Sequence, residues 1–374
     1  MKTLDFTAAA VLVVLVFYLL SVGQSLLLPL VIAIALWYLI NTLARTFYRV
    51  RVGDLQLPMP VCLLASIFTF MLVIWGLVNF FSGRVQEVIE VLPVYQANLT
   101  TRIESLPFVD VAAVQEQGLM QIVTGAIDFP SYATSLAADF ASIVASGGLI
   151  LIYILFLFLE QGNFPHKISA LVNDEKREKD VRRILSQVRD DIQKYISIKM
   201  FTSSLTGILS YIVLRILGVD FAGVWGLLIF LLNFIPTIGS IIATIFPALI
   251  ALAQSDGYTL VLLVLIGIGA LQVCIGNIIE PRMMGSSFNL SPIIILLNLA
   301  LWGYIWGIPG MFLCVPILII ITITLSHFPR TRPIAIILSS DGNLKGVLDS
   351  SLENFSFSVA SNDLLPGSDK EDDS

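Results

Sequence analysis

The chain has 374 residues, of which 57% are apolar and only 13% are charged, and its formal net charge at pH 7 is −6. The mean hydropathy of +0.90 lies far above that of soluble domains and predicts an integral membrane protein. This composition excludes a soluble globular domain, and nothing in the charge balance indicates a nucleic-acid partner.

Residues 1–83 are predicted to form the N-terminal membrane helices. Apolar runs cover residues 8–20, 25–40 and 61–81, and each approaches the length that a membrane helix needs. The short polar stretch 21–24 between the first two runs predicts a tight hairpin.

The first apolar run follows Lys2 and could also be a cleaved signal peptide. No small-x-small cleavage pattern follows it, and a second apolar run begins at once. We therefore expect a retained membrane helix.

Basic residues predict the orientation, because cytoplasmic loops near membrane helices carry an excess of Lys and Arg. Residues 161–199 hold nine Lys or Arg, whereas residues 84–140 hold two basic residues against seven acidic ones. We therefore expect residues 84–140 to be extracytoplasmic and residues 161–199 to be cytoplasmic. Both termini of this multi-pass cell-membrane protein are then cytoplasmic.

The two polar regions are predicted to be helical. In residues 174–199, apolar side chains recur at steps of three and four on an otherwise charged helix, which predicts a stripe that packs on the membrane surface or on a neighbouring subunit. Residues 84–140 show a looser pattern with a break at Pro93, which predicts short amphipathic helices at the interface. A membrane helix at 141–160 connects the two regions.

Residues 328–374 differ in character from the rest of the chain. They are rich in Ser, Gly and Asp and end in an acidic cluster. Such a segment cannot bury enough apolar surface to offset its ordering entropy, so we predict a disordered, acidic cytoplasmic tail.

Residues 200–327 are predicted to form a membrane transport core. Runs at 201–217 and 258–279 are long enough to span a bilayer, but the others are interrupted at 233–239 and 307–310. Proline removes a backbone donor and glycine tolerates unusual torsions, so each interruption predicts a broken helix or the tip of a re-entrant hairpin. Two such segments point to a transporter's substrate path, although glycine and proline are also simply more frequent in membrane helices.

Polar residues between the two interruptions predict a gate. Asn277 and Glu280 are three residues apart and can share a helical face, whereas Gln272 cannot join them at the same depth. Glu280 with Asn277 would form a proton- or cation-responsive gate near the inner end of its helix. The alternative is that Glu280 and Arg282 cap the helix at the cytoplasmic interface and pair there.

The candidate transport path or gate comprises ten residues with polar side chains or helix-breaking backbones. They are Asn233, Pro236, Gly239, Gln272, Asn277, Glu280, Pro281, Arg282, Gly307 and Gly310. Both histidines, His166 and His327, lie at membrane edges, and the sequence contains no His-Glu-x-x-His motif and no phosphate-binding loop. We therefore predict no enzyme activity, no metal site and no cofactor.

These residues together resemble the autoinducer-2 exporter family of membrane proteins, also called the PerM permease family. The resemblance covers about residues 8–326 and rests on the order and spacing of its motifs, since no single motif is specific. The motifs are Pro236-x-x-Gly239, Gln272, Asn277, Glu280-Pro281-Arg282-x-x-Gly285, Leu290-Ser291-Pro292, Gly303, Gly307, Gly310 and Val315-Pro316.

The resemblance implies an all-α polytopic membrane protein with about seven or eight membrane segments, broken or re-entrant helices among them, that assembles as a homo-oligomer. Family members are associated with export of the quorum-sensing signal autoinducer-2, and some with sodium/proton exchange. The leading hypothesis is a secondary transporter or exporter of a small polar solute, driven by Na⁺, H⁺ or the solute's own gradient.

Two alternatives stay open. A sodium/proton antiporter requires a buried carboxylate, and Glu280 is the candidate in the C-terminal half, although Arg282 beside it makes it less isolated than such a group usually is. A membrane scaffold that transports nothing could bind its partner through the amphipathic helix at 174–199.

Overall fold

The structure is a computed structural model that describes residues 2–49, 57–104, 146–172, 174–255, 257–285 and 289–342. Within these ranges every regular element is a helix, apart from one isolated β-bridge between Leu290 and Ser339, and turns connect the helices. The predicted all-α membrane fold is confirmed. Five segments are long and apolar enough to cross a bilayer, at 24–49, 59–80, 177–216, 259–284 and 292–327.

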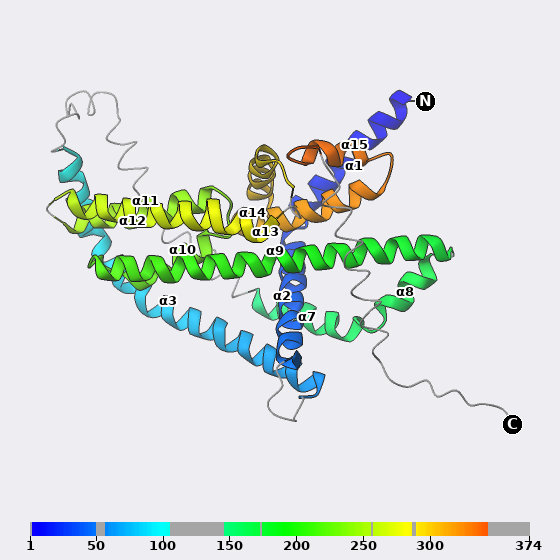
Figure 1. Cartoon of the computed structure of the whole chain (residues 1–374), viewed down its shortest axis with the longest axis horizontal. Coiled ribbons are helices and arrows are strands. Elements are labelled where there is room, and N and C mark those ends of the chain that lie inside the picture. The colour runs from blue at the N-terminus through cyan, green and yellow to red at the C-terminus, as the bar shows by residue number, and fades with distance from the viewer. Residues whose placement is uncertain are drawn as a thin grey trace.

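The chain begins with two helices that follow one another at a bend, α1 (Lys2–Val22) and α2 (Gln24–Arg49). The backbone N–H of Gly23 donates to the carbonyl of Leu19 at 2.8 Å, and the carbonyl of Gly23 accepts from the N–H of Leu27 at 2.9 Å. Helical hydrogen bonding therefore continues through the junction, and α2 leads on from α1 (Figure 1). The expected tight hairpin at 21–24 is wrong, because one glycine interrupts the helix without reversing it.

The third helix, α3 (Met59–Glu104), has 46 residues. It is about 69 Å long at 1.5 Å per residue, which is more than twice the thickness of a bilayer core. The expected break at Pro93 does not occur, because the helix runs through that residue. The third span and the start of the region predicted to be extracytoplasmic therefore form one continuous helix. The expectations for residues 105–140 lie outside the described residues.

Helices α7 (Gly147–Glu160) and α8 (Phe164–Leu171) follow. Helix α7 has 14 described residues, fewer than a full span needs, and the start of the expected span at 141–160 lies outside the described residues. It packs on α2 through four buried side chains. These are Ala33, Ile40, Ile150 and Ile154.

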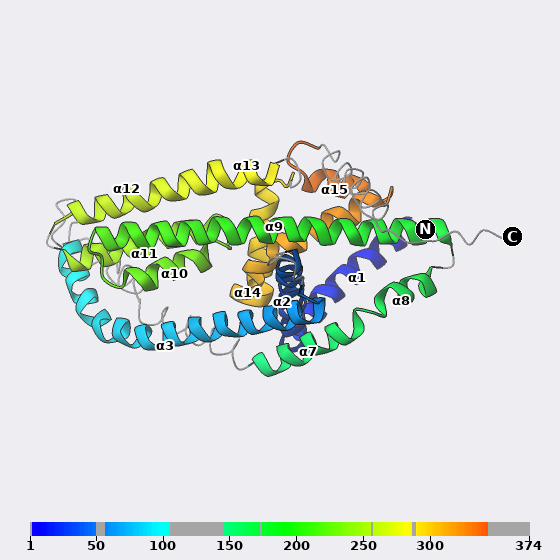
Figure 2. The same ribbon diagram turned by 60° about the horizontal axis from the view of Figure 1, so that its bottom comes forward.

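Helix α9 (Glu175–Ile216) joins two segments that the sequence separates at residue 199. The charged amphipathic region and the following apolar span form one helix of 42 residues. It lies along the longest axis of the molecule, with α12 beside it (Figures 1 and 2). The boundary expected between residues 199 and 200 therefore falls inside a continuous helix.

Helices α10 (Ala222–Leu232) and α11 (Ile238–Gln254) form a helical hairpin. The rings of Trp225 and Phe246 stack with centroids 6.3 Å apart across the two arms. At the open end, Gln254 Oε1 accepts from the backbone N–H of Asp220 at 2.9 Å. The expected break at 233–239 is thus the reversal between two antiparallel arms, which we call the first hairpin.

Helix α12 (Thr259–Cys274) passes through a five-residue π-helix, η1 (Ile275–Ile279), into the short α13 (Glu280–Met284). A π-turn inserts one residue into a helix and so rotates the side chains that follow it. It lies directly before Glu280, in the candidate gate.

The segment α14 (Pro292–His327) also reverses direction, at Gly307. Asn298 Nδ2 donates to the carbonyl of Cys314 at 2.6 Å, although sixteen residues of straight helix would separate them by about 24 Å. The arms 292–306 and 308–327 therefore lie side by side, and we call them the second hairpin.

Helix α15 (Arg332–Leu338) follows the second hairpin and packs against it. The N–H of Ser291 donates to the carbonyl of Leu338 at 3.0 Å, and the N–H of Ser340 donates to the carbonyl of Asn289 at 3.1 Å. The expected disorder is therefore wrong for residues 328–342, since these bonds hold them to the linker before α14. Residues 343–374 lie outside the described residues.

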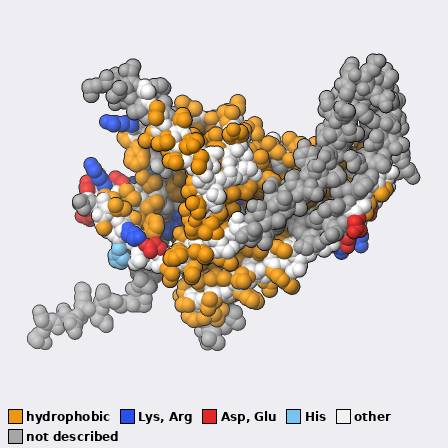
Figure 3. Space-filling model, turned by 180° about the vertical axis from the view of Figure 1, so that it is seen from behind, with side chains coloured by type: hydrophobic (Ala, Val, Ile, Leu, Met, Phe, Trp, Pro, Cys, Tyr) orange, Lys and Arg blue, Asp and Glu red, His pale blue; other side chains and the backbone are white. Residues whose placement is uncertain are grey.

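Apolar side chains cover much of the described surface (Figure 3). Large side chains such as Trp75, Leu151 and Tyr304 are exposed to more than half of their area, which a soluble protein would rarely tolerate over so wide a region. Charged side chains gather instead at the end formed by α8 and the start of α9 (Figure 3). This distribution fits a protein whose sides face lipid.

Candidate functional site

The tip of the first hairpin is a strained turn. Pro236 has no N–H to donate, and Thr237 adopts φ 60° and ψ −57°, a region that side chains other than glycine rarely occupy. A Cβ atom on Gly239 would overlap the carbonyl of Leu232. The Asn-x-x-Pro-x-x-Gly sequence therefore supplies the residues that this sharp reversal requires.

Asn233 ties this tip to the neighbouring helix. Its side chain is 7% exposed, and its Nδ2 donates to Ser203 Oγ on α9 at 3.0 Å. Because a buried amide without a partner would cost free energy, this bond fixes which face of α9 the tip contacts. Asn233 is thus a buried polar residue at the hairpin tip, and its place in the transport path stays a prediction.

The tip of the second hairpin uses two glycines. Gly307 has φ 63° and ψ −144°, a conformation essentially restricted to glycine. A Cβ atom on Gly310 would overlap the carbonyl of Trp302. Both glycines that the sequence singles out are therefore required by the backbone.

The two tips lie against each other. Phe234, in the first tip, stacks on Phe312, just beyond the second, with ring centroids 5.5 Å apart and planes 15° apart. Ile235 is 4% exposed and belongs to the same buried cluster as Trp302 and Trp306. The sequence predicts two interruptions, and the tertiary structure brings them to one place.

A buried ion pair lies between the helices that precede the two hairpins. Lys199 Nζ on α9 contacts Glu280 Oε1 at the start of α13 at 2.7 Å, and the two side chains are 7% and 14% exposed. Thr202 Oγ1 donates to Glu280 Oε2 at 3.2 Å. Removing one partner of a buried pair leaves an uncompensated charge, at a cost of about 3–5 kcal/mol.

Glu280 therefore differs from both expectations for it. Its partner is Lys199 rather than Arg282, because Arg282 is exposed. Asn277 is also exposed, whereas Glu280 is largely buried, so these two candidate gate residues do not share a face. The π-turn at 275–279 explains the difference, because it rotates the helix between the two positions. Pro281 is also exposed and opens α13.

Gln272 returns to the side of Glu280 through the same π-turn. In a regular α-helix, side chains eight residues apart point in directions that differ by about 80°. The residue that the π-turn inserts brings Gln272 and Glu280 close to two full turns apart, so they point in nearly the same direction. Gln272 is half-buried, and its Nε2 atom is buried with no hydrogen-bond partner among the described residues.

The sequence reasoning missed Lys199, Thr202 and Ser203. The sequence prediction assigns Lys199 to the cytoplasmic charges of residues 161–199, because it lies at the boundary between a charged region and an apolar run. A signal for all three exists, since polar side chains recur along one stripe of α9 at steps of three and four, and the structure buries each of them. The members of this stripe are Lys199, Thr202, Ser203, Thr206 and Ser210.

Among the described residues, no group of three or more His, Cys, Asp or Glu side chains is placed to hold a metal ion. The side chains at the tips and the ion pair instead offer hydrogen-bond donors and acceptors, one cation and one anion. Such a set can bind a small polar solute and respond to a proton or another cation.

Comparison with known proteins gives consistent matches over most of the chain. A family model described as "AI-2E family transporter" matches residues 7–330. The protein named "AI-2 transport protein TqsA" of Escherichia coli (strain K12) is 30% identical over 323 residues, covering 85% of this chain and 90% of that protein. A Haemophilus influenzae protein named "Putative transport protein" is 28% identical, covering 87% of this chain and 93% of its own length.

Proposed function

The chain belongs to the AI-2E family of membrane transporters, and we propose that it moves a small polar solute past the tips of its two helical hairpins. The solute class that we propose is that of AI-2, which gives the Escherichia coli relative its name. The route passes Asn233, Phe234 and Phe312, where the two broken helices meet. Interrupted helices near the middle of a membrane protein are the usual place for such a path.

The buried pair of Lys199 and Glu280 is the observation that carries the proposal. Helix α9 leads directly into the first hairpin, and α13 leads into the second. The pair therefore joins the two elements that the solute has to pass. When the pair breaks, α9 and α13 lose their strongest mutual contact, and the tips are free to separate.

Protonation of Glu280 is the event that breaks the pair in this proposal. A neutral Glu280 no longer balances the buried Lys199, so the closed arrangement loses its electrostatic support. A sodium ion competing for the carboxylate would act in the same way. The proposal therefore covers coupling to H⁺ or Na⁺, and it leaves sodium/proton exchange as an outcome that the experiment below would reveal.

We propose further that the protein is a homo-oligomer in the cell membrane with both termini in the cytoplasm. The excess of basic residues in 161–199 supports this orientation. The exposed apolar faces of α3 and α7 can serve lipid or a second copy. The mass of the protein in detergent and the accessibility of terminal tags in sealed cells measure the two points.

Reconstitution in liposomes tests the transport proposal. Uptake of AI-2 and of a panel of small hydroxylated solutes is measured under imposed proton and sodium gradients, with empty liposomes as the blank. We expect Glu280→Gln to abolish the pH dependence of flux, because glutamine keeps the size of the side chain and one acceptor oxygen but cannot ionise. Thermal unfolding in detergent shows that the variant is folded, at the lower stability that loss of a buried ion pair brings.

Arg282→Gln is the matched control, since Arg282 is two residues away but exposed, and we expect it to keep the pH profile of the unmodified protein. An unchanged profile in Glu280→Gln would remove Glu280 from the gate. Flux no greater than that of empty liposomes, for every solute and gradient, would contradict transport of this class of solute.

A further inference from the structure

The open end of the first hairpin, opposite its tip, is bound together by side chains. Gln254, the last residue of α11, donates from Nε2 to the carbonyl of Gly218 at 2.7 Å and accepts at Oε1 from the N–H of Asp220 at 2.9 Å. Both bonds reach the loop just before α10. One glutamine therefore ties the beginning of the hairpin to its end, and we call residues 217–221 and 253–254 the hairpin base.

Helix α3 holds this base from outside. Tyr95 Oη donates to Asp220 Oδ2 at 2.6 Å, and Asn98 Nδ2 donates to the carbonyl of Ala253 at 3.1 Å. These bonds join residues 125 and 155 positions apart in the chain. The part of α3 beyond the membrane-spanning segment 59–80 thus binds both strands of chain at the hairpin base, the one that enters α10 and the one that leaves α11.

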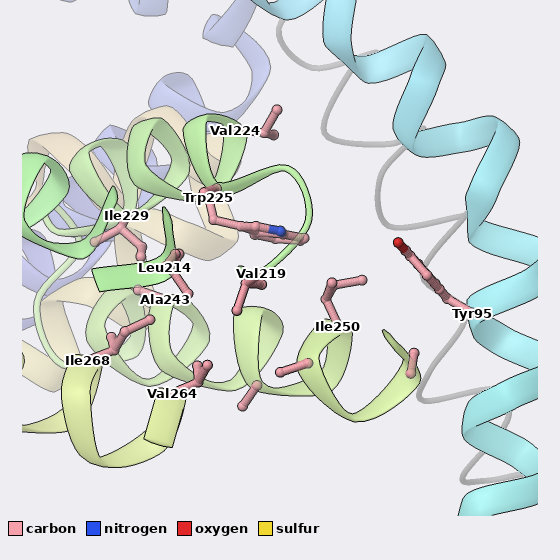
Figure 4. Close-up of a cluster of buried hydrophobic side chains, with 14 residues drawn as sticks. Tyr95, Leu214, Val219, Val224, Trp225, Ile229, Ala243, Ile250, Val264 and Ile268 are labelled. Carbon is pink, nitrogen blue, oxygen red and sulfur yellow. The ribbon is translucent and has the colours of Figure 1, made fainter. Parts of the chain in front are cut away.

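Apolar packing reinforces the grip. Tyr95 is 8% exposed and belongs to the same buried cluster as Val219, Trp225 and Ile250. In the close-up view, Tyr95 extends from α3 toward these side chains of the first hairpin (Figure 4). Burial, and then the hydrogen bond to Asp220, raise the pKa of the Tyr95 phenol. The phenol therefore stays protonated and donates throughout the physiological pH range.

The tip is held by fewer hydrogen bonds than the base. One neutral side-chain hydrogen bond, from Asn233 to Ser203, ties it to α9, and one aromatic stack joins it to the second hairpin. Thr237 adds backbone strain there, because residues other than glycine rarely adopt its φ of 60°. The base carries four hydrogen bonds and a buried tyrosine. The tip is held mainly by apolar packing of Ile235 against Trp302 and Trp306, which has no fixed direction, so its displacement breaks fewer hydrogen bonds.

We propose that the first hairpin pivots about a base fixed by α3, so that its tip is the moving gate and Tyr95, Asn98 and Gln254 are positioning residues. The inference rests on the proposed function, because it assigns movement to one end of the element that lines the proposed path. The base serves as the hinge, since a tip can open and close reproducibly only if the other end of a short hairpin stays in register. The outer half of α3 is then part of the transport machinery.

Two cross-links in the same hairpin test the proposal. In a chain whose three cysteines, Cys62, Cys274 and Cys314, are replaced, one variant carries Asn98→Cys with Ala253→Cys at the base, and the other carries Asn233→Cys with Ser203→Cys at the tip. A short thiol-specific reagent joins each pair, and reduction or cleavage of the linker reverses it. Each variant is its own control, since liposome flux is measured before linking, after linking and after release.

We expect the base cross-link to leave flux within about twofold and the tip cross-link to lower it at least about tenfold, because only the tip has to move. Recovery of flux on release shows that the linked protein was folded. Loss of flux with the base linked, or unchanged flux with the tip linked, would overturn the pivot. The Glu280→Gln pH profile reports separately on the proposed gate, so the two proposals can fail independently.

Substitutions at the base give a second readout. Asp220→Ala removes the acceptor for Tyr95, whereas Asp220→Asn keeps an oxygen in its place. We expect Asp220→Ala to raise the apparent KM several-fold with little change in maximal flux, and Asp220→Asn to restore most of the affinity, because a loosened base presents the tip in the wrong position. Equal KM values in all three proteins would show that the base does not position the tip.

Discussion

The two hairpins share one sequence signature and differ in how they are held. The first is fixed at its base by Gln254 and by Tyr95 from α3, and its tip carries one side-chain hydrogen bond. The second is bonded along its arms, because Asn298 donates to the carbonyl of Cys314 and accepts from Trp302 Nε1 at 3.1 Å. Trp306 Nε1 also binds the carbonyl of Leu20 on α1 at 3.1 Å.

A glycine and proline break in a membrane helix therefore does not by itself mark a moving part. In the second hairpin, hydrogen bonds join the two arms to each other and to the N-terminal helix α1, so we expect it to be rigid. The first hairpin is fixed at its base by several hydrogen bonds and has one side-chain hydrogen bond at its tip. Mutations at corresponding places in the two hairpins should therefore have different consequences.

The largest effect is expected where the two hairpins are alike. Gly239→Ala and Gly310→Ala each place a Cβ atom against a main-chain carbonyl, so the reversal has to open. We expect each to lower stability by more than about 3 kcal/mol, as misfit Gly→Ala changes combined with overpacking do, measured by thermal unfolding in detergent. Gly269→Ala on α12 is the control, because a Cβ atom there meets nothing within 4 Å. Stable, active Gly239→Ala would contradict the tip geometry.

Substitutions of Asn298 and Asn233 should have smaller effects on stability, and these effects should differ between the two hairpins. Asn298→Leu leaves the buried Trp302 Nε1 without its acceptor, so we expect a loss of about 1–3 kcal/mol in stability. Asn233→Leu removes a neutral bond worth about 1 kcal/mol, but it should change flux more than stability, because that bond closes the moving tip. Thermal unfolding and liposome flux are measured on both variants. If Asn233→Leu changed stability alone and Asn298→Leu changed flux alone, the roles of the two hairpins would be exchanged.

The smallest effect is expected at the base. Tyr95→Phe keeps the ring and removes the bond to Asp220, which contributes about 1 kcal/mol. Because the folded state raises the pKa of Tyr95, this contribution is fully present below the unfolded pKa of about 10 and is lost as pH rises through the folded value. The difference in Tm between the two proteins should therefore be constant from about pH 6 to 9 and shrink at higher pH. A difference that grows above pH 10 would contradict the assignment.

Several parts of the fold follow from local sequence. The apolar runs of α2, α3, α9 and α12 predict membrane helices. The chain reverses at the predicted interruptions 233–239 and 307–310. Local chemistry suffices there, because proline and glycine act on the backbone of their own segment. The resemblance to autoinducer-2 exporters identified the family correctly, as the match over residues 7–330 confirms.

Other features were out of reach of local reasoning. Gly23 bends the chain where a hairpin is expected, because one glycine permits a reversal without requiring it. The helix through Pro93 and the continuous α9 show that charge and hydropathy boundaries need not be helix boundaries. The assignment of Glu280 to Asn277 or Arg282 fails, because a π-turn changes the facing of every later residue and leaves no distinct pattern in the sequence.

Local sequence is enough to identify a helical membrane transporter of the AI-2E family and to place its helix breaks, because hydropathy, proline and glycine act over a few residues. Helix packing brings Lys199 to Glu280, stacks Phe234 of one tip on Phe312 of the other, and places Tyr95 against the first hairpin. These partners are between 78 and 125 residues apart. Contacts of that kind depend on how whole helices pack, which no single stretch of sequence encodes.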